Sequence, residues 1–164
     1  MSNFTRIFVM ALVPIVFLVD GNVLSLLSFE NAPLAPANPY VGSARCKECH
    51  EGEYERFTKS SKMSHSFNSI KLLRKGLTEQ EINTCYSCHT TGYGQLGGFV
   101  SEKDTPELKN NGCETCHGAG GKHVESSAIK DILAKPTIKQ CEFCHNESRS
   151  QAFNYKPMLF GGSH

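Results

Sequence analysis

Four copies of the pentapeptide Cys-x-x-Cys-His contain every cysteine of the 164-residue chain. Two thiols at this spacing can form thioether bonds to the two vinyl groups of a haem, and the adjacent imidazole can then bind the iron. We therefore predict four covalently attached haem c groups, with the histidine of each motif as proximal iron ligand. The motif residues are Cys46, Cys49 and His50; Cys85, Cys88 and His89; Cys113, Cys116 and His117; Cys141, Cys144 and His145.

Zinc sites and disulfides also use paired cysteines. Neither alternative requires a histidine directly after the second cysteine of all four motifs, whereas haem attachment does. A dithiol redox role is excluded for a similar reason, because the thioether bonds consume both thiols of each motif.

The histidine count limits the axial ligands. The chain has seven histidines, of which four are proximal ligands, so we predict His65, His123 and His164 as distal ligands. Seven histidines cannot provide eight axial positions. One iron must be five-coordinate, take a methionine (Met63 or Met158) or borrow a ligand from a neighbouring molecule. The longest stretch without a candidate ligand, residues 90–112, follows the second motif and indicates the second haem as the incomplete one.

The N-terminus has the pattern of an export signal. Arg6 precedes the apolar run Ile7–Val19, and haem attachment of this kind occurs outside the cytoplasm, so we expect a periplasmic or extracellular protein. Residues 20–22 interrupt what would otherwise be a span of about 20 residues, the length of a membrane helix. We interpret residues 1–30 as a cleaved signal and keep an uncleaved membrane anchor as the alternative.

The rest of the chain reads as a linker and one domain. Three prolines make residues 31–40 an extended linker, and residues 41–164 form the tetrahaem domain. About 125 residues for four haems leave only about 30 residues for each cofactor, so the macrocycles must supply much of the apolar core. We expect a mainly α fold of short helices and long loops around closely stacked haems.

Helix-start signals precede the motifs. We expect Ser43 to cap the turn that carries Cys46, and Pro106 to open the helix ahead of Cys113. Capping boxes at 78–81 and 137–140 should begin the helices of the second and fourth motifs. Between and after the motifs we expect helices over 51–67 and from 123 to about 134, and a C-terminal tail, 148–164, laid over haem faces.

The net charge of +1 indicates neither nucleic acid nor a strongly acidic partner. Four redox centres in so short a chain favour electron transfer between redox partner proteins, without a catalytic side chain. Two alternatives stay open. One is reduction of a small nitrogen oxide at a five-coordinate haem, which would make the protein an enzyme, and the other is a subunit of a conductive extracellular filament.

Three segments resemble the cytochrome c-554 family of tetrahaem cytochromes: the run from Tyr40 through the first motif to His65, the second motif with Thr90-Thr-Gly-Tyr93, and the third motif with Gly118-x-Gly-x-x-His123. The resemblance spans 40–164 and implies a mostly helical fold with stacked haem pairs. It further implies three bis-histidine haems and a five-coordinate haem at the second motif. The family carries electrons, classically from an octahaem hydroxylamine oxidoreductase, and nitric oxide chemistry has been proposed for its open haem.

The chain also differs from the family pattern. It is short, and Ala119 takes the place of the proline usual between the two glycines that follow the third motif. Related small tetrahaem cytochromes polymerise into filaments with ligands shared between subunits. Donation of His164 to a neighbouring copy would fit that behaviour.

Overall fold

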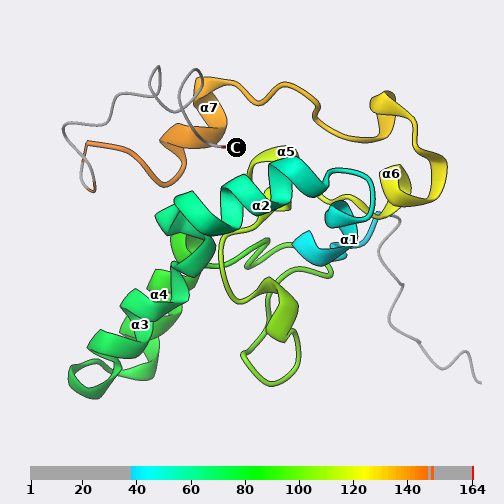
Figure 1. Cartoon of the computed structure of the whole chain (residues 1–164). Helices are drawn as coiled ribbons and strands as arrows, with labels where there is room; N and C mark the ends of the chain where they lie inside the picture. Colours follow the sequence, from blue (N-terminus) through cyan, green and yellow to red (C-terminus); the bar gives the residue numbers. More distant parts are fainter. Residues whose placement is uncertain (1–37, 148, 150–163) are drawn as a thin grey trace, which may run out of the picture. The chain divides into compact units, whose positions relative to one another are not determined.

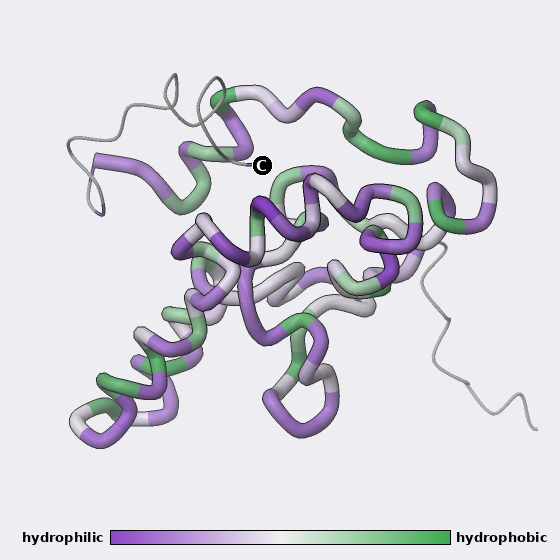
Figure 2. The backbone as a smooth tube through the Cα atoms, viewed as in Figure 1, coloured by the Kyte–Doolittle hydropathy of each residue, from purple (hydrophilic) through white to green (hydrophobic). Residues whose placement is uncertain are grey.

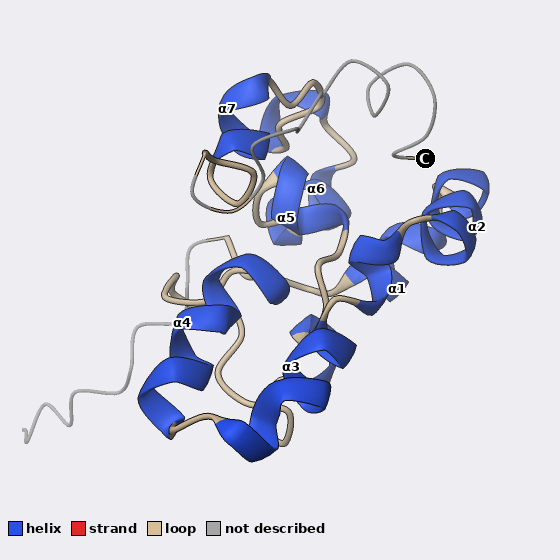
Figure 3. Ribbon diagram, turned by 90° about the vertical axis from the view of Figure 1, so that its left-hand side faces the viewer, coloured by secondary structure: helices blue, strands red, loops and turns tan. Residues whose placement is uncertain are grey.

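The computed structural model describes residues 38–147, 149 and 164, and within them the chain is helical and has no strand (Figures 1 and 3). The mainly α fold class is therefore confirmed. The helices are α1 (Ser43–Lys47), α2 (Glu51–Ser60), α3 (Phe67–Leu73), α4 (Glu79–His89), α5 (Cys113–His117), α6 (Gly121–Ser126) and α7 (Ile138–Glu142). Short 3₁₀ segments occur at η1 (Lys62–His65), η2 (Arg74–Gly76), η3 (Pro106–Leu108) and η4 (Ile129–Asp131).

The described residues lie in one compact unit, Leu34–His164. The predicted export segment, most of the linker and nearly all of the predicted C-terminal tail lie outside them. In the part of the chain that the structure describes, no helix combines the length and the apolar character of a membrane span.

Both predicted capping boxes are present. At the start of α4 the Glu81 N–H donates to Thr78 Oγ1 at 3.3 Å, and the Thr78 N–H donates to Glu81 Oε2 at 2.8 Å. At the start of α7 the Thr137 N–H donates to Gln140 Oε1 at 2.8 Å. These bonds satisfy backbone donors that a helix leaves free at its N-terminus, so the second and fourth motifs begin where the sequence indicates.

The predicted cap at Ser43 was wrong, whereas Pro106 does open a helical segment ahead of Cys113, although not the helix of the third motif. Gly42 precedes α1, and the Ser43 hydroxyl instead accepts the Cys113 N–H at 3.0 Å. Pro106 opens η3, which ends at Leu108, before the third motif begins its own helix at Cys113. The Ser43 bond joins the helix of the first motif to that of the third.

The two long helices that we predicted are each interrupted. The first ends at Ser60, because Ser61 has an extended backbone and its hydroxyl accepts the Met63 N–H at the start of η1. The second is the six-residue α6, which ends where Ser127 takes a left-handed conformation with φ of 55°. Hydroxyl side chains that bond to nearby backbone compete with helix continuation, and the apolar periodicity did not reveal this competition.

One apolar cluster lies between α3, α4 and the loop that follows α4. Its buried members are Phe67, Ile70, Ile82, Tyr86, Phe99 and Leu108. The rings of Tyr86 and Phe99 meet edge to face, with centroids 5.1 Å apart. Figure 2 shows apolar and polar residues alternating along α3 and α4, as expected where each helix buries one face. Because Tyr86 belongs to the second motif, this core directly supports that motif.

Candidate haem-binding sites

All four motifs keep the geometry of a helical turn. The second motif lies wholly on α4, and the third is α5 itself. In the first and fourth motifs only the leading residues are helical, yet the His50 N–H donates to the Cys46 carbonyl at 2.9 Å and the His145 N–H to the Cys141 carbonyl at 2.8 Å. A single turn therefore places the histidine beside both thiols of its motif, as haem attachment requires.

No disulfide joins the eight cysteines, and cysteines of different motifs lie close together. A hydrogen bond between Cys46 and Cys113 raises the pKa of Cys46 and lowers the pKa of Cys113. Burial, and then the neighbouring Cys88, raise the pKa of Cys144. The attachment points of the first and third motifs are thus neighbours, as are those of the second and fourth.

Burial also raises the pKa of Cys116 to about 11, and Cys141 contributes to this shift. A sulfur of the third motif therefore lies near the fourth motif as well. Together these contacts bring the sulfurs of all four motifs into one group, although the motifs are dispersed over a hundred residues of sequence.

Two pairs of imidazoles lie near each other with their ring planes close to parallel. The rings of His50 and His123 have centroids 6.3 Å apart with planes 23° from parallel. Those of His117 and His164 have centroids 6.0 Å apart with planes 25° from parallel. Each pair joins a proximal ligand to a distal ligand predicted from the sequence, and both pairs form within one chain.

These separations suit a shared iron. A metal–imidazole bond is about 2 Å long, and the ring centroid lies about 1.1 Å behind the nitrogen for ring bonds of about 1.33 Å. Two imidazoles on opposite sides of one iron therefore have centroids about 6.3 Å apart. Direct face-to-face packing of the same rings would allow a closer approach, so the residues present fit a haem iron held by two histidines.

Hydrogen bonds leave the iron-binding nitrogens free. The Nδ1 atoms of three histidines face backbone carbonyls: His89 faces Ser66 at 2.9 Å, His117 faces Leu133 at 2.7 Å, and His123 faces Ala128 at 3.0 Å. A carbonyl only accepts, so Nδ1 must carry the proton and Nε2 keeps a lone pair. This second contact is the usual way to orient a metal-binding imidazole.

A cavity of about 450 Å³ opens beside the third motif. Its lining residues are Asn38, His117, Gly118, Ala119, Lys122, Lys130, Asp131, Ile132 and Leu133. This volume is within the range of small-molecule sites. The proximal histidine of the third motif thus borders open space rather than packed side chains.

Three other predicted ligands, His65, Met63 and His145, lie within the described residues. His65 ends η1 and is exposed, Met63 lies in the same segment, and His145 directly follows Cys144. Met158, the other methionine that we considered as a ligand, lies outside the described residues.

Sequence reasoning missed the structural role of Glu114 and of Ser66. Glu114 lies within the third motif, is only 3% exposed, and accepts hydrogen bonds from the backbone N–H groups of Val41, Gly42 and Gly120. Its type and place gave no signal, because Glu142 occupies the same place in the fourth motif and is exposed. Ser66 gave no signal either, because an isolated serine between two helical segments is ordinary.

Residues 45–118 match the sequence profile of the family described as cytochrome c554 and c-prime. The chain is also similar to cytochrome c-554 of Nitrosomonas europaea, with 29% identity over 168 residues that cover 89% of this chain and 70% of the relative. No solved structure is significantly similar to the chain. The profile match spans the first three motifs, and the pairwise match extends over most of the chain.

Proposed function

Because the chain belongs to the cytochrome c554 family, we propose that it is an electron carrier that holds four haem c groups outside the cytoplasm. The observation that carries this proposal is the meeting of histidines from distant segments at the separation that one iron requires. The cysteines of each motif would hold one haem. Haem supplies one-electron chemistry, and the protein adjusts its potential through axial ligands, burial and hydrogen bonds.

We assign His50 with His123 to the first haem and His117 with His164 to the third. His65 is joined by a peptide bond to Ser66, whose carbonyl accepts the Nδ1 proton of His89. Nδ1 lies on the side of the ring away from the iron-binding Nε2. The backbone of His65 therefore lies on the Nδ1 side of the His89 ring, away from the iron. From that side the His65 imidazole cannot bind the iron on the opposite face of the second haem.

We accordingly assign His65 to the fourth haem, opposite His145, and leave His89 as the only protein ligand of the second haem. The contact between Cys46 and Cys113, and the closeness of Cys88 to Cys144, support short distances between the attached macrocycles. Electrons can then pass between haems without large protein motion, which is the property that a multihaem carrier needs.

Spectroscopy of the purified holoprotein tests this proposal. Mass spectrometry should find four haem groups, and low-temperature electron paramagnetic resonance should show three low-spin haems and one high-spin haem. Substitution H123A or H164A should each convert one further haem to high spin while all four haems stay attached. A count below four haems, or a resting protein with four low-spin haems, would contradict the ligand set.

The high-spin haem keeps the second function open. With His89 as its only protein ligand, the second haem would bind a diatomic molecule at its free position, as a nitrogen-oxide reductase requires. We expect carbon monoxide to bind rapidly to one haem per chain. Rapid binding without turnover of nitric oxide, when an electron donor is present, would favour the carrier over the reductase.

The filament is disfavoured by the position of His164, whose ring lies beside His117 of the same chain. We therefore propose that this ligand is supplied within one chain. Sedimentation of the holoprotein at high concentration should show a monomer, with spin states unchanged on dilution. We further propose that residues 1–30 direct export, either as a cleaved signal or as a retained anchor, and N-terminal sequencing of the mature protein distinguishes these outcomes.

A further inference from the structure

Ser66 is a buried residue that contacts His89 in two ways. It is 8% exposed and lies between η1 and α3. Its carbonyl accepts the His89 Nδ1 proton at 2.9 Å, and its hydroxyl donates to the His89 carbonyl at 2.8 Å. The ring and the backbone of His89 are therefore both bound to the same residue.

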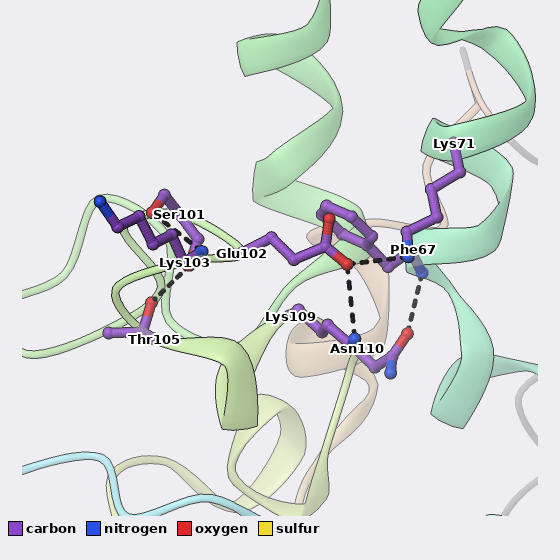
Figure 4. A network of polar contacts seen from close by, with 8 residues as sticks. All are labelled: Phe67, Lys71, Ser101, Glu102, Lys103, Thr105, Lys109 and Asn110. Carbon is purple, nitrogen blue, oxygen red and sulfur yellow. Dashed lines mark hydrogen bonds and ion pairs between the residues drawn. The ribbon is translucent and has the colours of Figure 1, made fainter.

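Asn111 bonds to Ser66, and Asn110 bonds to the next residue, Phe67. The Asn111 N–H donates to Ser66 Oγ at 2.9 Å, and Asn111 Nδ2 donates to the Cys88 carbonyl at 2.7 Å. Beside this contact, the Phe67 N–H donates to Asn110 Oδ1 at 3.0 Å (Figure 4). Asn111 is only 4% exposed, and its bond to Ser66 is buried.

The imidazoles of His117 and His123, which also face carbonyls, are held differently. Their acceptors, Leu133 and Ala128, lie in or next to the short η4 segment, and Leu133 is 41% exposed. Bonds near the surface compete with water, whereas buried ones do not. The His89 contact differs from these two because Ser66 binds both the ring and the backbone of His89 and is itself bonded to Asn111.

We propose that Ser66, supported by Asn111, is a positioning residue that fixes the imidazole of His89 at the second haem. This inference rests on the proposed function, in which His89 is the only protein ligand of that iron. In a bis-histidine haem a second imidazole also restrains the iron. Where only one imidazole binds, its orientation and basicity depend on its own hydrogen bond.

The same residue also ties two haem ligands together. His65, assigned to the fourth haem, precedes Ser66 directly, and consecutive Cα atoms are about 3.8 Å apart. The backbone that carries one ligand therefore accepts the proton of another. A displacement of His89 would be transmitted to His65 through one hydrogen bond and one peptide unit.

The test compares S66A and N111A with the wild-type holoprotein. Both substitutions loosen the carbonyl that accepts the Nδ1 proton, which makes the imidazole a weaker donor and favours the ferrous iron. We expect the equilibrium constant for reduction of the high-spin haem to rise about threefold to fivefold. The iron–histidine stretching band, which a five-coordinate ferrous haem shows, should move to lower frequency.

Two further variants serve as controls. S66T keeps the hydroxyl and should remain within about twofold of the wild type. S64A removes a nearby hydroxyl that donates to the carbonyls of Ser61 and of Thr58 at the end of α2 rather than to His89, and it should leave the stretching band in place. If S66A does not fold, N111A carries the same comparison.

The outcomes separate the two proposals. A wild-type protein with one high-spin haem whose band and potential do not move in S66A or N111A would overturn the positioning role alone. Equal shifts at all four haems would overturn it as well, since they would indicate general loosening. A wild-type protein with four low-spin haems would overturn the ligand assignment and the positioning role together.

Discussion

Replacement of Glu114 by alanine should strongly destabilise the protein. Its carboxylate is buried and accepts the N–H groups of Val41 at 3.0 Å, Gly42 at 2.8 Å and Gly120 at 2.8 Å. These donors come from two segments about 80 residues apart in sequence. The side chain thus joins the start of the folded unit to the loop that leads from the third motif to His123.

The loss in the free energy of unfolding follows from the backbone N–H groups that E114A leaves without an acceptor. A hydrogen bond to a charged group contributes about 1.5–3 kcal/mol, and a buried donor left unpaired costs about 1–3 kcal/mol. With three backbone donors, and some relaxation that admits water, we expect E114A to lower the free energy of unfolding by about 4 kcal/mol. E114Q keeps one acceptor oxygen but turns an amide donor toward the N–H groups, so its loss should be about 2 kcal/mol.

The fourth motif offers a matched control. Glu142 occupies the same place after its first cysteine as Glu114 does, but it is exposed. E142A should therefore change the free energy of unfolding by less than about 0.5 kcal/mol. Guanidinium unfolding of the holoproteins, followed by far-ultraviolet circular dichroism, measures all three variants. A loss below about 1 kcal/mol in E114A would refute the reasoning, because the N–H groups would then be satisfied without the carboxylate.

Three smaller effects should also be measurable by unfolding. T78A removes the α4 cap and should cost about 1 kcal/mol, whereas T84A, in the exposed middle of the same helix, should cost less. G118A places a side chain at a φ of 76° and should cost about 1 kcal/mol, an expectation that fails if G76A costs as much. Lys71 holds the pKa of Glu102 below its usual value (Figure 4). A lowered folded pKa stabilises above the unfolded value, so the wild type should exceed E102Q by less than about 1 kcal/mol near neutral pH and lose this excess as pH falls below about 4.5.

The parts of the fold that the sequence predicted depend on local chemistry. A capping box satisfies its donors within four residues, so Thr78 and Thr137 were sufficient to place two helix starts. The proximal histidines were predicted in the same way, because each directly follows the second cysteine of its own motif. The pairing of His117 with His164 could not be predicted from local sequence, because the two residues are 47 positions apart. Counting histidines identifies candidate ligands but does not show which two share an iron.

The errors share one cause. Ser43 and Ser61 were read by their helix position alone, yet each hydroxyl takes a backbone donor that sequence spacing does not indicate. Ser43 accepts from Cys113, 70 residues away, and Ser61 closes a turn that ends α2. For Ser43 the donor is decided by tertiary structure, whereas for Ser61 a local bond to Met63 competes with continuation of the helix.

The distribution of buried apolar side chains explains why the haem sites differ. The apolar cluster includes Tyr86 of the second motif and packs behind α4. By contrast, Phe143 of the fourth motif is 67% exposed, and Ile138 at the start of α7 is 36% exposed. About 2 kcal/mol is gained when such a side chain is buried, so the fourth motif has most to gain from a macrocycle packed against it. The polypeptide itself orders the second motif, where under the proposed ligand set one histidine would hold the iron alone, and the other sites would draw order from the haems and from paired ligands.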